Sequence, residues 1–219
     1  MRHSYLLYFF ITIMLSSCAK TTEPVETSFK RYPFKNVHIK YAITGDGSGT
    51  EELYIYNYGE RELVKSNYIS TVGGQFRQND QSVITRVADL YIYVPGAPVG
   101  QHVHVRSLDS LYNLKENFPS YTEIIDSVLE QGKFQLEGSE IIAGMPTQRW
   151  KQVMGNITLF YYKGLVLKRV VDGEDGTSLV QSAISVDTAW NADTALFTLP
   201  AGMTFQNGPL LPAPPEPIK

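Results

Sequence analysis

Apolar and polar residues alternate along most of the chain after residue 35. Val37, Ile39, Tyr41 and Ile43 take every second position between polar side chains, which predicts a strand with one buried face. Similar runs recur at hairpin spacing, separated by turns rich in glycine, asparagine and proline, such as the turn over 45–49. The pattern predicts strands at 37–43, 53–58, 62–72, 83–94, 102–105, 140–143, 148–153, 157–162, 166–171 and 177–186. We therefore expect a mainly β fold built from antiparallel hairpins.

One stretch in the middle of the chain has helical periodicity instead. The run from Ser120 to Glu123 has the spacing of a capping box, and apolar residues that include Ile125 and Leu129 then recur at helical offsets until Gly132. Residues 107–114 favour a second, shorter helix before Pro119. The sequence thus predicts one or two helices inserted into a sheet protein, an α+β arrangement dominated by strands.

Composition narrows the class of protein further. The chain has 219 residues with 43% hydrophobic and 19% charged residues, which indicates one folded domain with little charge. The formal net charge of -3 argues against binding to nucleic acid, which needs a basic surface. The single cysteine allows neither an internal disulfide nor a thiolate metal cluster.

The N-terminal segment has the features of a secretory signal. A positively charged start, Met1-Arg2-His3, precedes an apolar run over 5–15 that is too short to span a membrane. Leu15-Ser16-Ser17-Cys18 follows and resembles the bacterial lipobox, in which the cysteine becomes the acylated N-terminus. The alternative is an ordinary signal with an incidental cysteine, but Cys18 is the only cysteine of the chain. We predict a signal peptide over 1–17 and lipidation of Cys18.

These features predict how the mature chain is organised. Residues 18–34 are polar and lack periodicity, which favours a flexible tether between the acyl chains and the fold. Residues 35–205 form the single domain, and residues 206–219 form an extended, exposed tail because they contain five prolines, at positions 209, 212, 214, 215 and 217. Acyl chains on Cys18 would hold the protein on a membrane. Ala19 after the cysteine favours the outer membrane, in the periplasmic or the surface leaflet.

Residues with catalytic or metal-binding chemistry are sparse. His102 and His104 lie two apart, so on a strand they share a face and could hold a metal with a carboxylate, although a solvated strand face is the interpretation we prefer. The acidic residues near Asp175 lack the spacing of an EF-hand. The chain has no G-x-S-x-G nucleophile motif. We therefore expect no enzyme activity, no metal and no cofactor.

Aromatic residues form the most informative set of side chains. They alternate along three predicted strands, so that the members of each group share a strand face: Tyr54, Tyr56 and Tyr58 on the first, Tyr91 and Tyr93 on the second, and Phe160 and Tyr162 on the third. Such residues are either core or the lining of an amphipathic pocket, and the sequence leaves both interpretations open. With Ile125 and Leu129 from the predicted helix, they are the candidate ligand-binding residues.

The order of several motifs in the second half resembles a known family. The motifs are Gly138 to Gly144, Arg149-Trp150-Lys151, Phe160 to Lys168, and Leu196 to Pro200. They resemble periplasmic proteins of the LolA/LolB type, and the hairpin from Glu51 to Glu62 is similar to one in uncharacterised envelope lipoproteins related to them, of the kind found in Bacteroidetes. The resemblance implies a strongly curved antiparallel sheet, an unclosed half-barrel, with helices covering its concave face.

The resemblance also implies a function. In the family's carriers the concave face holds lipoprotein acyl chains, so we expect a lipid or other hydrophobic ligand in the half-barrel and a role in envelope lipid or lipoprotein trafficking. The expected partners are the membrane, through Cys18, and this ligand. An alternative is a non-catalytic accessory or structural subunit of an envelope complex, with a filled cavity and a protein partner in the envelope.

Overall fold

The computed structural model describes residues 30–71, 76–105, 129 and 133–208. Within these ranges the chain forms one sheet of twelve strands. In chain order the strands are β1 (Val37–Gly45), β2 (Gly47–Tyr56), β3 (Arg61–Ser70), β4 (Arg77–Arg86), β5 (Asp89–Tyr93), β6 (Val99–His104), β7 (Phe134–Ile142), β8 (Met145–Gln152), β9 (Ile157–Tyr162), β10 (Leu165–Asp172), β11 (Ser178–Asp187) and β12 (Thr204–Asn207). Two short 3-10 helices accompany them, η1 (Asn57–Gly59) and η4 (Thr194–Phe197).

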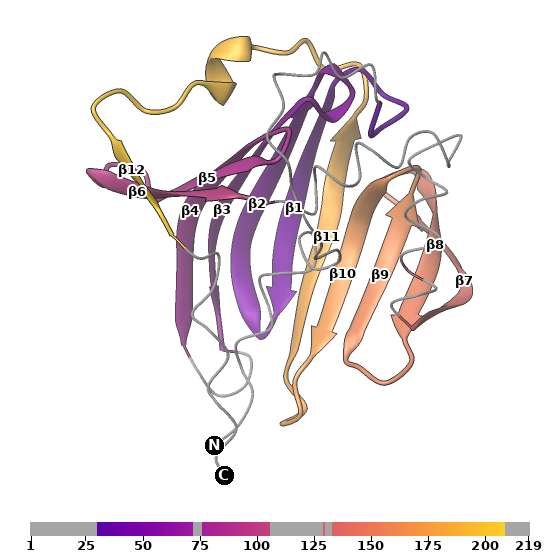
Figure 1. Cartoon of the computed structure of the whole chain (residues 1–219). Coiled ribbons are helices and arrows are strands. Elements are labelled where there is room, and N and C mark those ends of the chain that lie inside the picture. The colour runs from indigo at the N-terminus through magenta and orange to yellow at the C-terminus, as the bar shows by residue number, and fades with distance from the viewer. Residues whose placement is uncertain (1–29, 72–75, 106–128, 130–132, 209–219) are drawn as a thin grey trace.

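The sheet is open, with β12 and β7 at its two edges. Its strand order is β12-β6-β5-β4-β3-β2-β1-β11-β10-β9-β8-β7. Every neighbouring pair is antiparallel except β12 and β6, which run parallel. Figure 1 shows the sheet twisting, so that β5 and β6 run across the direction of β1 and β2. The prediction of a mainly β, antiparallel and unclosed sheet is confirmed.

The two predicted helices lie outside the described residues, with one exception. Leu129 is helical and buried, and it packs in a cluster with Trp150, Leu159 and Tyr161. In the described ranges no helix has seven or more residues, so the prediction that one or two helices cover the concave face is not confirmed. Nor is any helix there long and apolar enough to cross a bilayer.

The region predicted as one strand over 83–94 is a hairpin of β4 and β5. Val87 has a φ of 55° and Ala88 follows it, so that Arg86 pairs with Asp89 across a two-residue turn. A β-branched residue rarely adopts positive φ, and no glycine, proline or asparagine marks the turn in the sequence. Backbone hydrogen bonds hold it from outside, from Val87 N to Glu60 O and from Val105 N to Ala88 O.

The glycine-rich segment over 45–49 is mostly strand and not the long turn that we expected. Gly47 and Gly49 belong to β2 and pair with Ser70 and Tyr68 of β3. Only Asp46 lies between β1 and β2. Its side chain accepts a hydrogen bond from the backbone of Ser178, which ties this tight turn to β11.

The fold begins before residue 35, so the predicted tether boundary needs correction. Arg31 and Tyr32 are buried, and their backbone nitrogens donate to the carbonyl oxygen of Tyr58. Gly59 makes this approach possible, because a Cβ there would lie 2.9 Å from side-chain atoms of Arg31 and Tyr32. At the other end, β12 includes residues 206 and 207, which we had assigned to the tail.

Cross-strand pairing separates the side chains of the central strands into two faces. On what we call the Tyr41 face, Tyr41 pairs with Glu51, Glu51 with Ser66, and Ser66 with Gln81. On the opposite Tyr54 face, Tyr54 pairs with Leu63, Leu63 with Ile84, and Ile84 with Tyr91. Both faces contribute buried residues, so core packs on each side of the sheet.

Leu129 lies on the Tyr41 face. It packs with Trp150 and Leu159, which pair with each other across β8 and β9. From Leu159 the cross-strand pairing continues to Arg169 of β10 and then to Gln181 of β11. Gln181 pairs with Ile43 of β1, which lies two residues from Tyr41. Residues two apart on a strand share a face.

Candidate functional site

Four of the candidate tyrosines come together on the Tyr54 face. Tyr54 and Tyr56 of β2 and Tyr91 and Tyr93 of β5 pack around a buried cluster that contains Leu63, Ile84 and Phe197. The period-two pattern of the sequence therefore grouped each pair on the correct common face.

The segment around η4 covers these tyrosines. Phe197 is only 1% exposed and its ring lies 5.8 Å from that of Tyr56. The Trp190 ring lies 5.3 Å from that of Tyr54, and Leu196 and Leu199 pack on the same cluster. Asp193 caps η4 by accepting from the backbone of Ala195. Side chains of this segment therefore pack on the half-buried tyrosines.

The other candidate residues lie elsewhere, which corrects the expectation of one shared pocket. Tyr58 lies in η1 with a φ of 60°, and Lys30 lies over its ring. Phe160 and Tyr162 belong to a separate cluster with Val37 and Leu167. Leu129 lies on the opposite face, and Ile125 is outside the described residues. Alternation predicts which residues of one strand share a face, but not which segments cover that face.

A histidine and a carboxylate lie at the edge of the tyrosine cluster. The His38 ring stacks on Tyr54 at 4.3 Å, and His38 Nε2 lies 3.2 Å from Glu52 Oε2. Tyr54 also donates its hydroxyl hydrogen to Glu52. Burial raises the pKa of Glu52, but hydrogen bonds from Tyr54 and His38 outweigh it and hold that pKa below its usual value. Burial and the Glu52 carboxylate raise the pKa of Tyr54. The arrangement stabilises a charged carboxylate beside a neutral phenol.

His102 and His104 share a face of β6, as their spacing predicted, and both contact one carboxylate. His102 Nε2 and His104 Nδ1 each lie 3.0 Å from Asp89 Oδ1. Burial raises the pKa of Asp89, but the two histidines lower it by more, so the carboxyl stays ionised to lower pH than usual. In the described part of the chain, no group of three or more His, Cys, Asp and Glu side chains is arranged to hold a metal ion.

The Tyr41 face carries a row of polar residues that the sequence analysis missed. Glu51 accepts hydrogen bonds from Ser66 Oγ at 2.7 Å and from the side-chain amide of Gln181. Ser66 and Gln181 are both buried. Tyr41 donates to Val166 O at 3.0 Å, and burial, with a smaller contribution from Glu51, strongly raises the pKa of its hydroxyl. The sequence signal for this polar row is Glu51, which lies two residues before Leu53 and four before Ile55 and therefore shares their strand face.

An apolar row runs beside this polar row on the same face. Leu53 pairs with Val64, Val64 with Val83, and Val83 with Ile92, across β2, β3, β4 and β5. All four side chains are half-buried. Val64 and Ile92 belong to none of the buried hydrophobic clusters that the described residues form, so their apolar surface is only partly used in packing.

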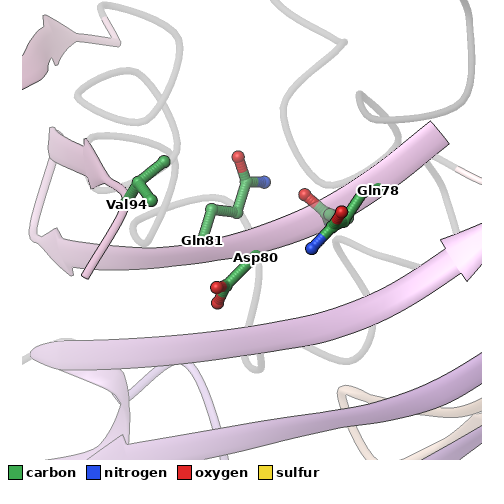
Figure 2. A pocket seen from close by; sticks show the side chains of 5 residues that line it. Gln78, Asp80, Gln81 and Val94 are labelled. Atoms are coloured by element: carbon green, nitrogen blue, oxygen red, sulfur yellow. The ribbon is translucent and has the colours of Figure 1, made fainter. Parts of the chain in front are cut away.

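A depression of about 360 Å³ lies at the β4 end of the polar row. It is lined by Gln78, Asn79, Asp80, Gln81 and Val94. Figure 2 shows Gln78, Asp80 and Gln81 along β4, with Val94 to one side. Gln81 pairs with Ser66, which connects one side of the depression to the polar row, whereas Gln78 and Asp80 alternate with Gln81 along β4 and lie on the Tyr54 face. Four of its five lining residues are polar, so it suits a polar group better than an acyl chain.

Comparison with known proteins supports the fold alone. No protein-family model matches the sequence, and no curated protein matches it. Among solved structures, an uncharacterized conserved protein from Thermus thermophilus is similar, with a TM-score of 0.51 and 9% identity over 80% of this chain and 92% of that chain. An identity this low supports a common architecture and carries no information about activity.

Two further likenesses are weaker. The Pseudomonas aeruginosa MucA/MucB complex matches with a TM-score of 0.44 and 16% identity, over 76% of this chain and 56% of that one. A LolA superfamily protein from Nitrosomonas europaea matches with a TM-score of 0.32 and 12% identity, over 78% and 93%. Both scores are below 0.5, so neither likeness supports an argument about this chain.

Proposed function

We propose that the protein is a non-catalytic envelope lipoprotein that binds an amphipathic ligand, an acyl chain with a polar end, on the Tyr41 face. One observation carries this proposal: a half-buried apolar row, Leu53, Val64, Val83 and Ile92, lies directly beside a hydrogen-bonded polar row on the same face. Such a face complements a molecule that has an apolar part and a polar part next to each other.

The apolar row supplies the binding free energy. Burying apolar surface contributes roughly 25 cal/mol per Å², so covering the remaining exposed surface of several aliphatic side chains contributes a few kcal/mol. The four residues come from four adjacent strands, so the row crosses the sheet. An extended acyl chain lying across the strands would contact all four.

The polar row would orient the ligand. Glu51 is hydrogen-bonded to Ser66 and Gln181, and a carboxylate has acceptor positions beyond these two. A hydroxyl or amine at the ligand's polar end could donate to it. The polar depression beside Gln81 would take the solvated part of that group.

The anchor and the location of the protein are part of the same proposal. Leu15 to Cys18 supports acylation of Cys18, and Ala19 after it favours attachment to the outer membrane. A tethered protein meets membrane lipids at high local concentration, so modest affinity suffices for transfer or storage of a lipid. This role needs no nucleophile, metal or cofactor.

A second candidate function has support from the Tyr54 face. There the aromatic side chains are covered by Trp190 and Phe197, so among the described residues this part of the Tyr54 face holds a filled core. A filled cavity is what an accessory subunit of an envelope complex would have. Crosslinking in native membranes that captures one stable protein partner, without lipid on the purified protein, would favour this role.

Binding of a fluorescent fatty acid to the mature chain with Cys18→Ala tests the lipid proposal. We expect saturable binding that is lost when Val64→Asp places a charge in the apolar row. Ile69→Asp is the matched control, because Ile69 lies on the Tyr54 side of the same strand. Circular dichroism would show that both variants fold. Absence of binding, or equal loss in both variants, would contradict the proposal.

A further inference from the structure

The C-terminal strand β12 is attached to the sheet by few contacts. It has four residues, lies at the edge, and pairs with β6 on one side. Phe205 packs edge-on against Tyr91 and Tyr93, with ring centroids at 5.3 Å and 6.3 Å. A further side-chain contact joins Asn207 Oδ1 to His102 Nδ1, at 2.9 Å. Backbone hydrogen bonds hold the strand at its two ends, from Thr204 N to Pro98 O and from Gly208 N to His102 O. Its side-chain attachment depends on the Phe205 ring and on His102.

His102 has an oxygen acceptor at each of its ring nitrogens. Asn207 Oδ1 faces Nδ1, and Asp89 Oδ1 faces Nε2 at 3.0 Å. A neutral imidazole carries one N–H and can donate to only one of these oxygens, whereas an imidazolium donates to both. The two contacts together, which we call the His102 bridge, are satisfied when the ring is protonated.

We propose that the His102 bridge is a pH-dependent fastening of β12, which holds the edge strand while His102 is protonated and loosens it when the ring loses a proton. The neutral ring keeps one hydrogen bond and gives up the other. Because Asn207 is uncharged and Asp89 is a carboxylate, the bond to Asn207 is the one that is lost.

The charged groups around His102 act in both directions. Asp89 on β5 favours the imidazolium, and His104 on β6 shares the same carboxylate oxygen. The His102 ring stacks on Tyr91 at 4.8 Å, and Arg86 of β4 lies over the Tyr91 ring at 5.6 Å, so its charge opposes protonation. The carboxylate is hydrogen-bonded directly to the ring, whereas the guanidinium lies on the far side of Tyr91.

Release of β12 would change the surface of the molecule. The backbone of β6 that pairs with Thr204 to Asn207 would become available to another strand. The Phe205 ring would leave Tyr91 and Tyr93, which exposes an aromatic surface beside it. The strand thus regulates access to one edge of the sheet.

Hydrogen exchange and ring 15N NMR of the full mature chain test this proposal. Because one hydrogen bond of the edge strand is lost, we expect amides 204–208 to exchange about tenfold faster at about pH 8 than at about pH 5.5, after correction for intrinsic rates. His102→Gln should abolish this pH dependence. His104→Gln should retain it, because the ring that is hydrogen-bonded to Asn207 is that of His102.

Asn207→Asp distinguishes the two orientations of the Asn207 amide. If Asn207 presents its oxygen, an aspartate there accepts the same hydrogen bond and slows exchange of β12 at acidic pH. If Asn207 instead donates its NH₂ to a neutral ring, the aspartate removes that donor and speeds exchange, which would overturn the proposal. Ring 15N shifts of a neutral His102 at about pH 5.5, or exchange of 204–208 that is independent of pH, would overturn it as well.

Discussion

A buried ion pair joins the segment before β1 to the sheet, and removing it tests whether this segment belongs to the fold. Arg31 Nη1 lies 2.9 Å from Glu62 Oε1, and the two side chains are 5% and 8% exposed. Tyr32 donates its hydroxyl hydrogen to the same carboxylate at 3.1 Å. The Arg31→Met substitution keeps much of the apolar stem and removes the charge.

The expected loss of stability is large. Removing one partner of a buried ion pair typically costs about 3–5 kcal/mol, because the other charge stays buried without compensation. Domains of this size have about 5–15 kcal/mol in total. With a urea m value of about 2 kcal/mol per molar, the unfolding midpoint should fall by about 2 M.

Urea unfolding followed by tryptophan fluorescence measures this effect. Glu62→Gln alone should also destabilise, and the double variant should lose less than the sum of the two single variants. Lys30→Met is the matched control, because Lys30 makes a cation–π contact to the ring of Tyr58, at 4.2 Å, and is an exposed residue. Its effect should be at most about 1 kcal/mol. An Arg31→Met midpoint equal to that of the parent would refute our assignment of this segment to the fold.

Three further substitutions or titrations test other parts of the structure. Phe197→Ala should destabilise the protein by about 3–5 kcal/mol, because this residue is only 1% exposed and packs on the tyrosine cluster; a thermal unfolding curve like that of the parent would contradict this expectation. Gly100→Ala places a Cβ 2.7 Å from the Phe205 ring and 2.9 Å from the carbonyl oxygen of Ile92, so hydrogen exchange should accelerate at every pH in residues 204–207 and around Ile92, and stay unchanged in strands distant from β5 and β6. The folded pKa of Tyr41 is raised, so its contribution to stability is complete below the unfolded pKa of about 10 and is lost as the pH rises from there toward the folded value. Alkaline unfolding should therefore begin at higher pH in Tyr41→Phe, and absorbance titration of the wild type should show the Tyr41 phenol ionising only when the protein unfolds.

Hydrophobic alternation predicted the strands best where one face is clearly buried. The bounds of β9 match the prediction at both ends, and β1 begins at the predicted residue. The hairpin at Val87 was missed because its turn is held by distant backbone groups, of Glu60 and Val105. Such tertiary support leaves no local trace in the sequence.

Residues outside the regular pattern were also missed for tertiary reasons. Arg31 and Tyr32 lie in a polar segment, and their partners, Glu62 and Gly59, are about thirty residues away. The strand β12 has only four residues and no buried side chain, so its parallel pairing with β6 could not be read from periodicity.

The candidate site was predicted only in part. Spacing placed Tyr54 with Tyr56, and Tyr91 with Tyr93, on common faces, and the structure brings both pairs together. What covers them, Trp190 and Phe197, comes from more than ninety residues further along the chain. The interpretation as core or as pocket depended on that cover, which the sequence alone does not specify.

Methyl NMR with a spin-labelled fatty acid tests the central claim most directly. We predict that the methyl signals of Leu53, Val64, Val83 and Ile92 broaden on titration of the Cys18→Ala protein, because these residues share the Tyr41 face. The Ile69 methyl signals should stay sharp, since that side chain lies on the opposite face. No broadening at the apolar row, or broadening confined to Ile69 and its neighbours, would contradict lipid binding on the Tyr41 face.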